Sequence, residues 1–357
     1  MNNKKNIKKE KKQSPALLRE GIGEGFINFS IIIPNYNGSQ FLADCLKSLL
    51  TSLSKLKSTE VEIILIDNAS KDNSIEIFEQ NIPKSFNYRI LLNSKNKGFA
   101  GAVNQGIKIA KHQYVVLLNN DLTMSEDWFQ LISQSIKDNK NPKVATFFGT
   151  VLTKDGTKYE SQGLDFFYSG KCQNISNGFP FSKSLLTPCP VKGRVWEGFF
   201  VWGASAALIV YKKEIIKKIG LFDEDFFAYE EDVDLALRLH NLNYQTLYIP
   251  KALSYHLGGG TSNKMGIFRN KMDTKNWIYI IIKNFSLKEI SQNFFQIFEE
   301  RLRNLSGLTK KTINFYKIKA IFYLPLVLFS TYGQVLINLP KMFKKRKQLQ
   351  KLYKLLT

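Results

Sequence analysis

The sequence predicts an α/β fold with a mostly parallel central sheet, followed by a C-terminal helical region. From Phe29 onward, short apolar runs alternate with amphipathic stretches, and this alternation is typical of βα units. Each apolar run ends in polar, turn-forming residues. From about Phe268 onward, the chain is rich in Lys, Ile and Phe at helical spacing. A chain of 357 residues, 44% of them hydrophobic, can form one large core and an appended segment.

Strands and helices are expected to alternate along the first part of the chain. The predicted strands span Phe29–Ile33, Val61–Ile66, Tyr88–Leu92 and Tyr114–Leu118, and the helices between them span Gln40–Ser54, Ser74–Glu79 and Ala100–Lys111. An irregular or hairpin-rich stretch follows, and after it come a strand at Ala204–Val210, a helix at Lys212–Ile219 and a helix that starts near Glu231. Open α/β sheets bind ligands beyond the carboxyl ends of their strands. The Asn- and Asp-rich strand ends therefore predict one polar ligand site.

Two common nucleotide-binding motifs are missing from the positions where they would act. A dinucleotide site requires GxGxxG between the first strand and its helix, but the chain has Pro34–Gly38 there. The run Gly21–Gly25 precedes the strand, where it cannot contact a pyrophosphate in that fold. GxxxxGK followed by Ser or Thr does not occur either. These observations argue against an NAD-dependent enzyme and against a P-loop nucleoside triphosphatase.

The segment Asn119–Asp121 follows the strand predicted at Tyr114–Leu118. This position places the carboxylate of Asp121 at the sheet edge, where oxygen ligands can hold a divalent cation and a diphosphate can complete its coordination. The alternative is a simple Asn/Asp turn, which is frequent in α/β proteins. Taken alone, the segment leaves both interpretations open.

A second acidic segment is harder to explain as local structure. Between Asp223 and Asp234, seven of twelve residues are acidic and none is Lys or Arg, whereas the whole chain has 30 acidic residues among 357. Helix capping and an ion pair between Asp234 and Arg238 account for some of these carboxylates. They do not account for Glu230–Asp232, because adjacent like charges repel unless a cation or a functional demand holds them there. A carboxylate in this segment can act as a general base.

The formal charge of +21 indicates an anionic partner or surface. Lysines crowd the polar N-terminal tail, and a basic cluster, Lys341–Lys347, follows the uncharged run Ala320–Pro340. That run has roughly the ~20 residues needed to cross a bilayer, but it contains prolines and polar residues. It is either a membrane-embedded or interfacial anchor supported by the basic cluster, or a buried helix pair that packs on the main domain. Because the lysines lie in tails, we expect no nucleic-acid partner.

Other features indicate a reducing compartment. The three cysteines, Cys45, Cys172 and Cys189, are odd in number and show no CxxC spacing, so neither a disulfide framework nor a zinc site is indicated. The N-terminal segment has Lys and Asn in place of the apolar stretch of a secretory signal. We therefore expect a cytoplasmic protein that is peripheral to, or C-terminally anchored on, the cytosolic face of the cell membrane.

The order of the motifs resembles that of family 2 glycosyltransferases. Four segments carry this resemblance in the first half of the chain: Ser30–Asn37, Ile66–Ser74, Asn96–Gly106 and Leu118–Asp121. Two more, Gly220–Phe227 and Tyr229–Arg238, are similar to the acceptor-side block of the rhamnosyltransferase-like branch. The resemblance covers about Phe29 to Ser262. It implies a GT-A nucleotide-sugar-binding fold, an inverting mechanism and a nucleotide-sugar donor.

The resemblance also implies a set of site residues. The nucleotide-sugar site would comprise Pro34, Asn35, Tyr36, Asn37, Asp67, Asn68, Asn96, Gly98, Phe99, Asn104, Asn119 and Asn120, with Asp67 contacting the base. The acceptor would contact Trp202, Gly203, Ala204 and Glu230. Asp232 would be the general base, with Glu231 as the less favoured candidate. Asp121 would bind a divalent cation, Mn²⁺ or Mg²⁺, together with His256, although a single histidine is often structural.

One position departs from the family pattern. Asn119 stands where a full DxD motif has its first acid. This departure predicts weaker metal binding or a greater dependence on His256.

The leading hypothesis is an inverting glycosyltransferase of cell-surface polysaccharide synthesis, a rhamnosyltransferase being one possibility. Residues 1–26 would form a basic disordered tail, residues 27–265 the GT-A domain, and residues 266–357 a helical, membrane-associating region. The expected partners are a nucleotide-diphosphate sugar, a glycan or lipid-linked acceptor, and an anionic membrane surface. The alternative is a catalytically silent nucleotide-sugar-binding or scaffold protein of the same fold, which the intact Asp121, Asp232 and His256 disfavour. The sequence does not specify the sugar, the acceptor or the oligomeric state.

Overall fold

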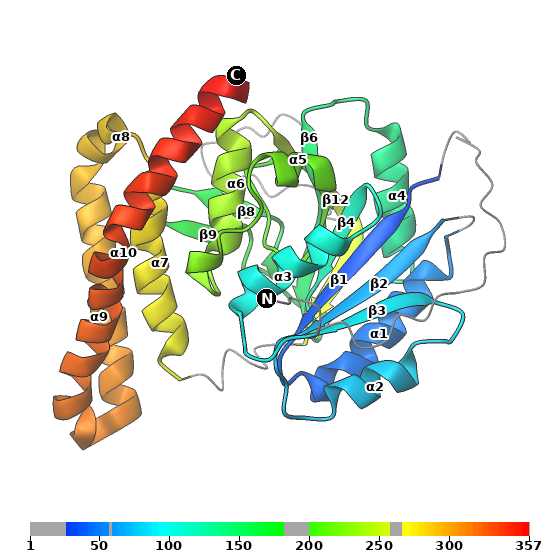
Figure 1. The fold of residues 1–357 in the computed structure, drawn as a ribbon, viewed down its shortest axis with the longest axis horizontal. Helices are drawn as coiled ribbons and strands as arrows, with labels where there is room; N and C mark the ends of the chain where they lie inside the picture. The colour runs from blue at the N-terminus through cyan, green and yellow to red at the C-terminus, as the bar shows by residue number, and fades with distance from the viewer. Residues whose placement is uncertain (1–25, 57–58, 182–199, 258–265, 357) are drawn as a thin grey trace, which may run out of the picture.

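The first four strands form one side of a central sheet in the computed structural model, which describes residues 26–56, 59–181, 200–257 and 266–356 (Figure 1). These parallel strands are β1 (Phe29–Asn35), β2 (Val61–Asp67), β3 (Asn87–Leu92) and β4 (Tyr114–Leu118), in the order β4-β1-β2-β3. β1, β2 and β4 are almost entirely buried and rich in Ile, Leu and Val, as expected for strands covered on both faces. The predicted strands lie where they were expected.

The other side of the sheet is mixed. β11 (Leu208–Lys212) runs antiparallel between β4 and β6 (Val144–Thr153), and β12 (Gln245–His256) is parallel to β6. Three short strands pair antiparallel with these: β5 (Leu122–Met124) and β10 (Phe200–Val201) with β12, and β7 (Tyr159–Ser161) with β6. A separate hairpin consists of β8 (Leu164–Phe166) and β9 (Cys172–Asn174). β12 returns the chain to the end of β4, where its last residue, His256, pairs with Leu122.

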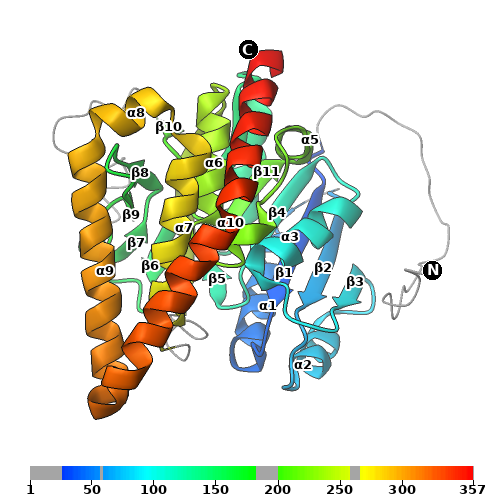
Figure 2. The same ribbon diagram turned by 60° about the vertical axis from the view of Figure 1, so that its left-hand side comes forward.

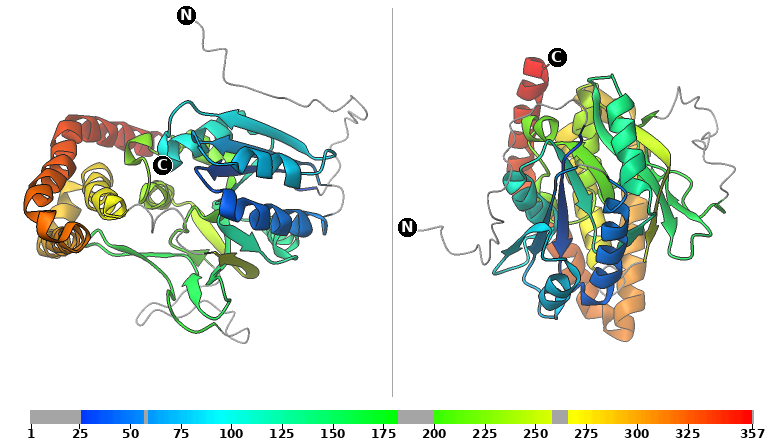
Figure 3. Two further views of the ribbon diagram at one scale, coloured as in Figure 1. Left: turned by 90° about the horizontal axis from the view of Figure 1, so that it is seen from below. Right: turned by 90° about the vertical axis from the view of Figure 1, so that its right-hand side faces the viewer.

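Helices cover both faces of the sheet. The steps from β1 to β2 and from β2 to β3 move in one direction across the sheet, so right-handed crossovers place α1 (Ser39–Leu53) and α2 (Ser74–Asn81) on the same face. The step from β3 to β4 moves back, which places α3 (Gly98–Ile109) on the opposite face, as Figures 1 and 3 show. The remaining helices before residue 257 are α4 (Trp128–Asp138), α5 (Lys213–Lys218), the short 3₁₀ helix η2 (Glu224–Phe226) and α6 (Glu231–Asn241).

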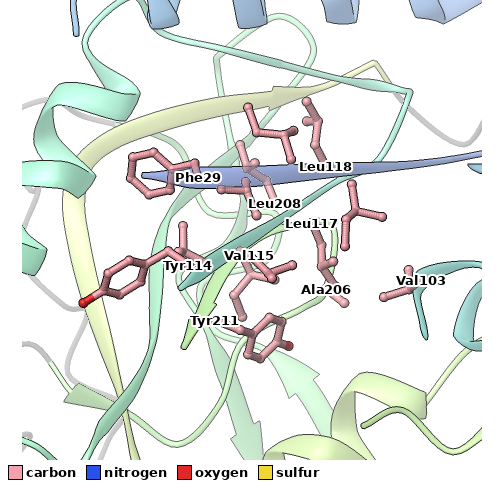
Figure 4. Packing of buried hydrophobic residues seen from close by; sticks show 14 of the residues in the cluster. Phe29, Val103, Tyr114, Val115, Leu117, Leu118, Ala206, Leu208 and Tyr211 are labelled. Carbon is pink, nitrogen blue, oxygen red and sulfur yellow. The ribbon is translucent and has the colours of Figure 1, made fainter. Parts of the chain in front are cut away.

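The main hydrophobic core lies between these helices and the sheet. Figure 4 shows Phe29 of β1, Tyr114 and Leu117 of β4, and Leu208 of β11 packed close together. The ring of Phe29 contacts that of Phe129 on α4 edge-on, with centroids 5.3 Å apart. This packing joins the parallel and mixed sides of the sheet, so the strand ends at the ligand edge rest on a rigid support.

The C-terminal region is helical, as predicted, and packs against α6. It contains α7 (Phe268–Asn284), α8 (Leu287–Gln292), α9 (Phe294–Tyr316), a short turn at Lys317–Lys319 (η4), and α10 (Ala320–Leu356). α9 and α10 lie side by side as an antiparallel pair next to α7 (Figures 1 and 2). A second hydrophobic cluster joins α6, α7, α9 and α10, and includes Val233, Trp277, Ile297 and Val335.

The pair of helices α9 and α10 exposes large apolar side chains. Phe295, Ile318, Phe329 and Ile337 are 83%, 90%, 80% and 79% exposed, respectively. Within Phe294–Leu356 the chain is long and apolar enough to cross a membrane, judged by length and composition alone. The most apolar window is only 22% buried. The run Ala320–Pro340 thus belongs to one helix, α10, and does not form the buried helix pair of the alternative interpretation.

The expected α/β fold with a C-terminal helical region is confirmed. The predicted N-terminal tail, apart from residue 26, and Cys189 lie outside the described residues. The region expected to be irregular or hairpin-rich after Thr150 contains the end of β6, the short strand β7 and the hairpin β8-β9, while β12 was not predicted.

Candidate active site

One cavity of about 620 Å³ lies beyond the carboxyl ends of β1, β2 and β4. Most of the predicted site residues line it. They are Pro34, Asn35, Tyr36, Asn68, Asn96, Gly98, Phe99, Asn119, Asn120, Asp121, Glu230, Glu231, Asp232 and His256. The fold thus brings together segments that lie up to about two hundred residues apart in the chain, as the polar strand ends predicted.

The donor-side wall is a hydrogen-bonded set of side chains. Asn35, which is 1% exposed, donates from Nδ2 to Asp67 Oδ1 at 3.0 Å and accepts at Oδ1 from Asn120 Nδ2 at 2.6 Å. Gly38 permits this arrangement, because a Cβ there would lie 2.0 Å from Asn120 Nδ2. Asp67 Oδ2 accepts from the backbone N–H of Ser70 at 3.0 Å. These bonds connect the ends of β1, β2 and β4 and fix the shape of the cavity wall.

The start of α3 closes the same wall. Asn68 Nδ2 donates to the Gly98 carbonyl at 2.9 Å, and Asn96 Oδ1 accepts from the Gly98 N–H at 2.8 Å. Gly98 has φ +73°, and a Cβ there would lie 2.2 Å from the carbonyl oxygen of Phe227. Glycine is therefore required at this position by both the backbone conformation and the close contact with the acceptor-side loop.

Asp121 and His256 face each other across the cavity edge. The pairing of β5 with β12 and a hydrogen bond from Leu257 N–H to the Asp121 carbonyl (2.8 Å) bring His256 Nε2 to 3.2 Å from Asp121 Oδ2. On the other side of the ring, Nδ1 lies 2.6 Å from Glu160 Oε1, which the sequence did not predict. A carboxylate that holds the second ring nitrogen is the usual outer partner of a metal-binding histidine.

The donor set fits a divalent cation. Among the described residues no group of three His, Cys, Asp or Glu side chains could hold a metal by itself. A cation bound by one carboxylate, one imidazole and the oxygens of a substrate diphosphate needs no third such ligand. Asn119 also lines the cavity, and its Oδ1 is buried without a hydrogen-bond partner among the described residues. Burial lowers the pKa of His256, but hydrogen bonds and charges from Asp121 and Glu160 outweigh it and raise the pKa to about 10.

Asp232 lines the cavity from the first turn of α6. Its Oδ2 accepts from the backbone N–H of Ala206 at 3.1 Å, and its Oδ1 accepts from Val233 N–H at 2.8 Å. Burial raises the pKa of Asp232, while these hydrogen bonds favour the carboxylate and oppose the rise. A carboxylate held in this way, with its pKa moved toward neutrality, has the properties of a general base.

The two neighbouring glutamates differ from Asp232. Burial raises the pKa of Glu231 and of Glu230 well above the usual range, and nearby carboxylates raise it further. Glu231 is 6% exposed, and its Oε2 has no hydrogen-bond partner among the described residues. Burial thus disfavours the charged form of both glutamates, whereas the carboxylate of Asp232 is stabilised by two backbone hydrogen bonds. Of the three carboxyl groups, Asp232 is therefore the best placed to accept a proton.

The loop before α6 is strained and is held by α7. Phe227, Tyr229 and Glu230 have φ values of +68°, +67° and +66°, which non-glycine residues rarely adopt. The fully buried side chain of Asn276 donates to three carbonyls of this region, those of Phe226, Ala228 and Tyr229, at 3.1, 2.9 and 2.7 Å. The acceptor-side wall of the cavity thus depends on a residue of the C-terminal helical region.

The cations that neutralise the acidic segment also come largely from the C-terminal helices. Lys283 Nζ of α7 lies 2.7 Å from Asp223 Oδ2 and 2.8 Å from the Asp234 carboxylate. Arg238 pairs with Asp234 at 2.9 Å, and Lys345 of α10 pairs with Asp223. The acidic residues of this segment therefore form two sets. One set forms ion pairs with these cations, while Glu230, Glu231 and Asp232 face the cavity.

Part of the predicted basic cluster Lys341–Lys347 binds other parts of this protein, while Lys344 and Lys347 are exposed and the lipid contact of the cluster stays a prediction. Lys341 and Lys345 form ion pairs with Asp225, and the buried Arg346 donates to the Ile282 carbonyl at 3.0 Å. The half-exposed Lys341 and the more buried Lys345 reach the acidic segment, and Arg346 binds the end of α7.

The remaining predicted site residues lie outside the cavity lining. Asn37, with φ +51°, bonds the loop after β2 through Ser70 and Lys71. Asp67 lies behind this wall and accepts a hydrogen bond from Asn35. Asn104, which is 3% exposed, exchanges hydrogen bonds with the backbone of Phe222, which lies 118 residues further along the chain. These contacts are supporting ones, and the predicted nucleotide contacts of these residues stay predictions.

The same holds for three predicted acceptor residues. Trp202 stacks on Phe166, with ring centroids 4.8 Å apart and an interplanar angle of 11°. Gly203 packs closely on α6, since a Cβ there would lie 2.7 Å from that of Ala236, and Ala204 is buried. The cavity is lined instead by residues that the sequence did not predict, including Glu160, Ser205, Ala206, Phe227, Tyr229, Phe268 and Arg269.

The arrangement of a polar donor wall, an Asp–His pair and a buried acidic segment agrees with comparisons to known proteins. The sequence profile of glycosyl transferase family 2 matches residues 30–219, more than half of the chain. The chain belongs to glycosyl transferase family 2. Within this family, a poly-beta-1,6-N-acetyl-D-glucosamine synthase of Staphylococcus epidermidis is 28% identical over 249 residues, which cover 70% of this chain and 54% of the relative. The chain spans about half the length of the curated relatives that it matches.

Solved structures confirm the GT-A fold. The mannosyltransferase PcManGT of Pyrobaculum calidifontis, in complex with GDP-Man and Mn²⁺, has a TM-score of 0.52 at 12% identity, covering 91% of this chain and 85% of that one. S. aureus TarS 1-349 in complex with UDP has a TM-score of 0.50 at 16% identity, covering 90% and 92%. None of these three proteins is named as a rhamnosyltransferase, so that narrower assignment is not confirmed.

Proposed function

We propose that this glycosyltransferase moves a sugar from a nucleoside-diphosphate donor to a hydroxyl of a glycan or lipid-linked acceptor, with inversion at the anomeric carbon, in cell-surface polysaccharide synthesis. The observation that carries the proposal is the position of Asp232. Two backbone amides hold its carboxylate on the wall of the cavity that also contains the Asp121–His256 pair. The named activity of the S. epidermidis relative supports a role in polysaccharide synthesis.

In this proposal, one displacement step transfers the sugar. Asp232 accepts the proton of the acceptor hydroxyl, and that oxygen forms a bond to the anomeric carbon. The bond between the anomeric carbon and the diphosphate oxygen breaks at the same time, and the nucleoside diphosphate leaves with the electron pair. The amides of Ala206 and Val233 orient Asp232 for this role.

Asp121 and His256 would hold a divalent cation, with Glu160 orienting the imidazole. When bound, Mn²⁺ or Mg²⁺ would supply positive charge to the departing diphosphate. The need for such a charge follows from the carboxylates of Asp121 and Glu160, which lie on either side of the His256 ring on the cavity wall. A diphosphate would be repelled by these carboxylates without a cation.

The proposal assigns catalysis to residues 27–265 and membrane association to residues 266–357. The open apolar side of α9 and α10 supports contact with a lipid surface, since large exposed apolar patches mark such interaction sites. Binding to the cytosolic face would place the cavity where nucleotide sugars are made. The donor sugar is left to experiment, with rhamnose favoured by the motif resemblance and N-acetylglucosamine by the named relative.

The deciding experiment compares Asp232→Asn with the wild-type enzyme. A panel of nucleotide sugars, including dTDP-rhamnose and UDP-N-acetylglucosamine, is first screened by thermal shift, because a ligand that binds the native state stabilises it. With the donor that binds, Asp232→Asn should lower kcat by roughly 10²–10⁴-fold. The affinity for the nucleotide should stay the same, because Asp232 lies on the acceptor side.

Asp138→Asn, an exposed change on α4, is the matched control and should keep full activity. Undiminished turnover in Asp232→Asn would rule out this residue as the base. Binding of nucleotide sugar by the wild-type chain without turnover on any acceptor would instead favour the silent binding protein of the same fold.

A further inference from the structure

A second cavity, of about 390 Å³, lies between η2, α7 and α10. It shares two lining residues, Phe227 and Phe268, with the catalytic cavity. Their rings meet edge-on, with centroids 6.1 Å apart and planes at 75°. The two cavities are therefore neighbours separated by an aromatic pair, and a ligand that leaves the catalytic cavity across this pair would enter the second one.

A buried lysine supplies the first polar group of this cavity. Lys275 is 5% exposed, and its Nζ donates to the Asp225 carbonyl at 3.1 Å. An ammonium group has three N–H donors. No second hydrogen-bond acceptor for Lys275 is found among the described residues, and its charge lies 4.9 Å from the centroid of the Tyr279 ring. A buried ammonium with spare donors is costly unless a ligand or water satisfies it.

The polar residues of the apolar helix α10 supply the second group. Gln334 and Asn338 interrupt the uncharged run Ala320–Pro340, and their spacing of four residues places them on one side of the helix. Both line the second cavity, whereas Leu336 and Ile337, 66% and 79% exposed, do not line it. The half-buried Asn338 and the exposed Gln334 thus lie on the side of α10 that lines this cavity, while Leu336 and Ile337 give the helix an exposed apolar side. A helix that served only as a membrane anchor would not need two carboxamide side chains on this side.

The lining has the chemistry of a sugar site. Two carboxamides, the Glu224 carboxylate and the Lys275 ammonium offer donors and acceptors for hydroxyl groups. Phe227, Phe268 and Tyr279 offer flat apolar surfaces, on which the C–H face of a sugar ring can pack. Asp225 contributes little net charge, because Lys341 and Lys345 pair with it. The cavity therefore suits a neutral, hydroxyl-rich ring.

We propose that this second cavity is an acceptor subsite, which binds the next sugar of a glycan acceptor while the terminal sugar lies at Asp232. The inference rests on the proposed function and deepens it. It makes the acceptor a chain of at least two sugars, and it gives α10 a role in acceptor recognition besides membrane contact.

The test compares acceptors of different length. Free glycan fragments are prepared from the envelope polysaccharide of the source cells and separated into single sugars, disaccharides and longer chains. For the wild-type enzyme, the second sugar should raise kcat/KM by about tenfold or more, the effect of about 1.4 kcal/mol of added binding. Asn338→Trp, which fills the cavity, should remove this gain, while hydrolysis of the donor without acceptor should stay unchanged.

Ile337→Trp is the matched control, because it adds the same bulk one residue away on the exposed side of α10. It should keep the gain. Gln334→Ala alters an exposed side chain that cannot disturb the core, and it should lower the gain in part. Equal melting temperatures of the three variants would show that they are folded.

The proposal is overturned if disaccharides are no better than single sugars, or if Asn338→Trp keeps the gain. Free fragments carry no phosphate, so a cavity that instead holds the phosphate of a lipid carrier would give the first of these results. A wild-type enzyme that turns over no donor at all would count against the proposed function itself, and the two failures are therefore distinguishable.

Discussion

Replacing Lys283 by Met should destabilise the whole protein, although Lys283 does not line the catalytic cavity. Lys283 is 5% exposed and lies between two buried carboxylates, those of Asp223 and Asp234. Burial alone would raise the pKa of each carboxyl group. The charge of Lys283 outweighs this effect, together with that of Lys345 at Asp223 and of Arg238 at Asp234, and both pKa values are held below the ordinary range.

The size of the effect follows from the charges that remain. Removing one partner of a buried ion pair typically costs about 3–5 kcal/mol, because an uncompensated charge is left in the interior. In Lys283→Met, Asp234 keeps Arg238 and Asp223 keeps Lys345, so neither carboxylate loses every partner. We therefore expect a loss near the lower end, about 3 kcal/mol in the free energy of unfolding.

Urea unfolding at several pH values measures this loss. Carboxyl groups with lowered folded-state pKa values stabilise the protein above their unfolded pKa of about 3.9, and that stabilisation disappears as the pH falls toward the folded-state values. Lys283→Met weakens this contribution, so the difference from wild type should be largest near pH 7 and should shrink below about pH 4. Lys344→Met, an exposed change on α10, should alter stability by less than about 0.5 kcal/mol. A Lys283→Met variant as stable as the control at pH 7 would refute the reasoning.

Three further predictions follow from the site and from the C-terminal helices. Glu160→Gln should weaken Mn²⁺ binding in the presence of UDP by about tenfold, because outer carboxylates orient a histidine ligand; calorimetric titration with unchanged Mn²⁺ affinity would contradict it. Burial raises the pKa of Asp232, so kcat should fall with decreasing pH in an acid limb centred above about 3.9, as the protonated base cannot accept a proton; a flat pH–rate profile down to that pH would contradict this. The double variant Phe322→Asp, Phe329→Asp should sediment much less with anionic phospholipid vesicles than the wild-type protein does. The control Tyr168→Asp, in the loop between β8 and β9, should sediment as the wild type does. Equal sedimentation of the double variant and the control would place the membrane contact elsewhere.

The sequence predicted the first half of the fold well because its signals are local. Each βα unit in Phe29–Leu118 carries its own apolar strand, amphipathic helix and polar strand end, and parallel strands leave those polar ends at one edge. The strand β12 was missed because its apolar residues are interrupted by Pro250 and Lys251 near an irregular register with β6. Glu160 was missed for another reason. Its partner, His256, lies 96 residues away, and nothing near either residue indicates the contact.

The acidic segment shows why the separate roles of the residues in a site are harder to predict than the position of the site. Its charge excess correctly indicated that capping alone does not explain it. Arg238 pairs with Asp234 within α6, but the lysines that pair with Asp223, Asp225 and Asp234 lie 49 to 122 residues downstream, on α7 and α10. Glu230, Glu231 and Asp232 face the catalytic cavity instead, and the loop before α6 is held by Asn276 of α7. α10, whose open apolar side we propose to contact a membrane, therefore also holds the acidic segment through Lys341 and Lys345. Displacing α7 or α10 would disturb the base and the acceptor cavity together, so truncation after residue 265 should abolish transfer even where the GT-A sheet remains folded.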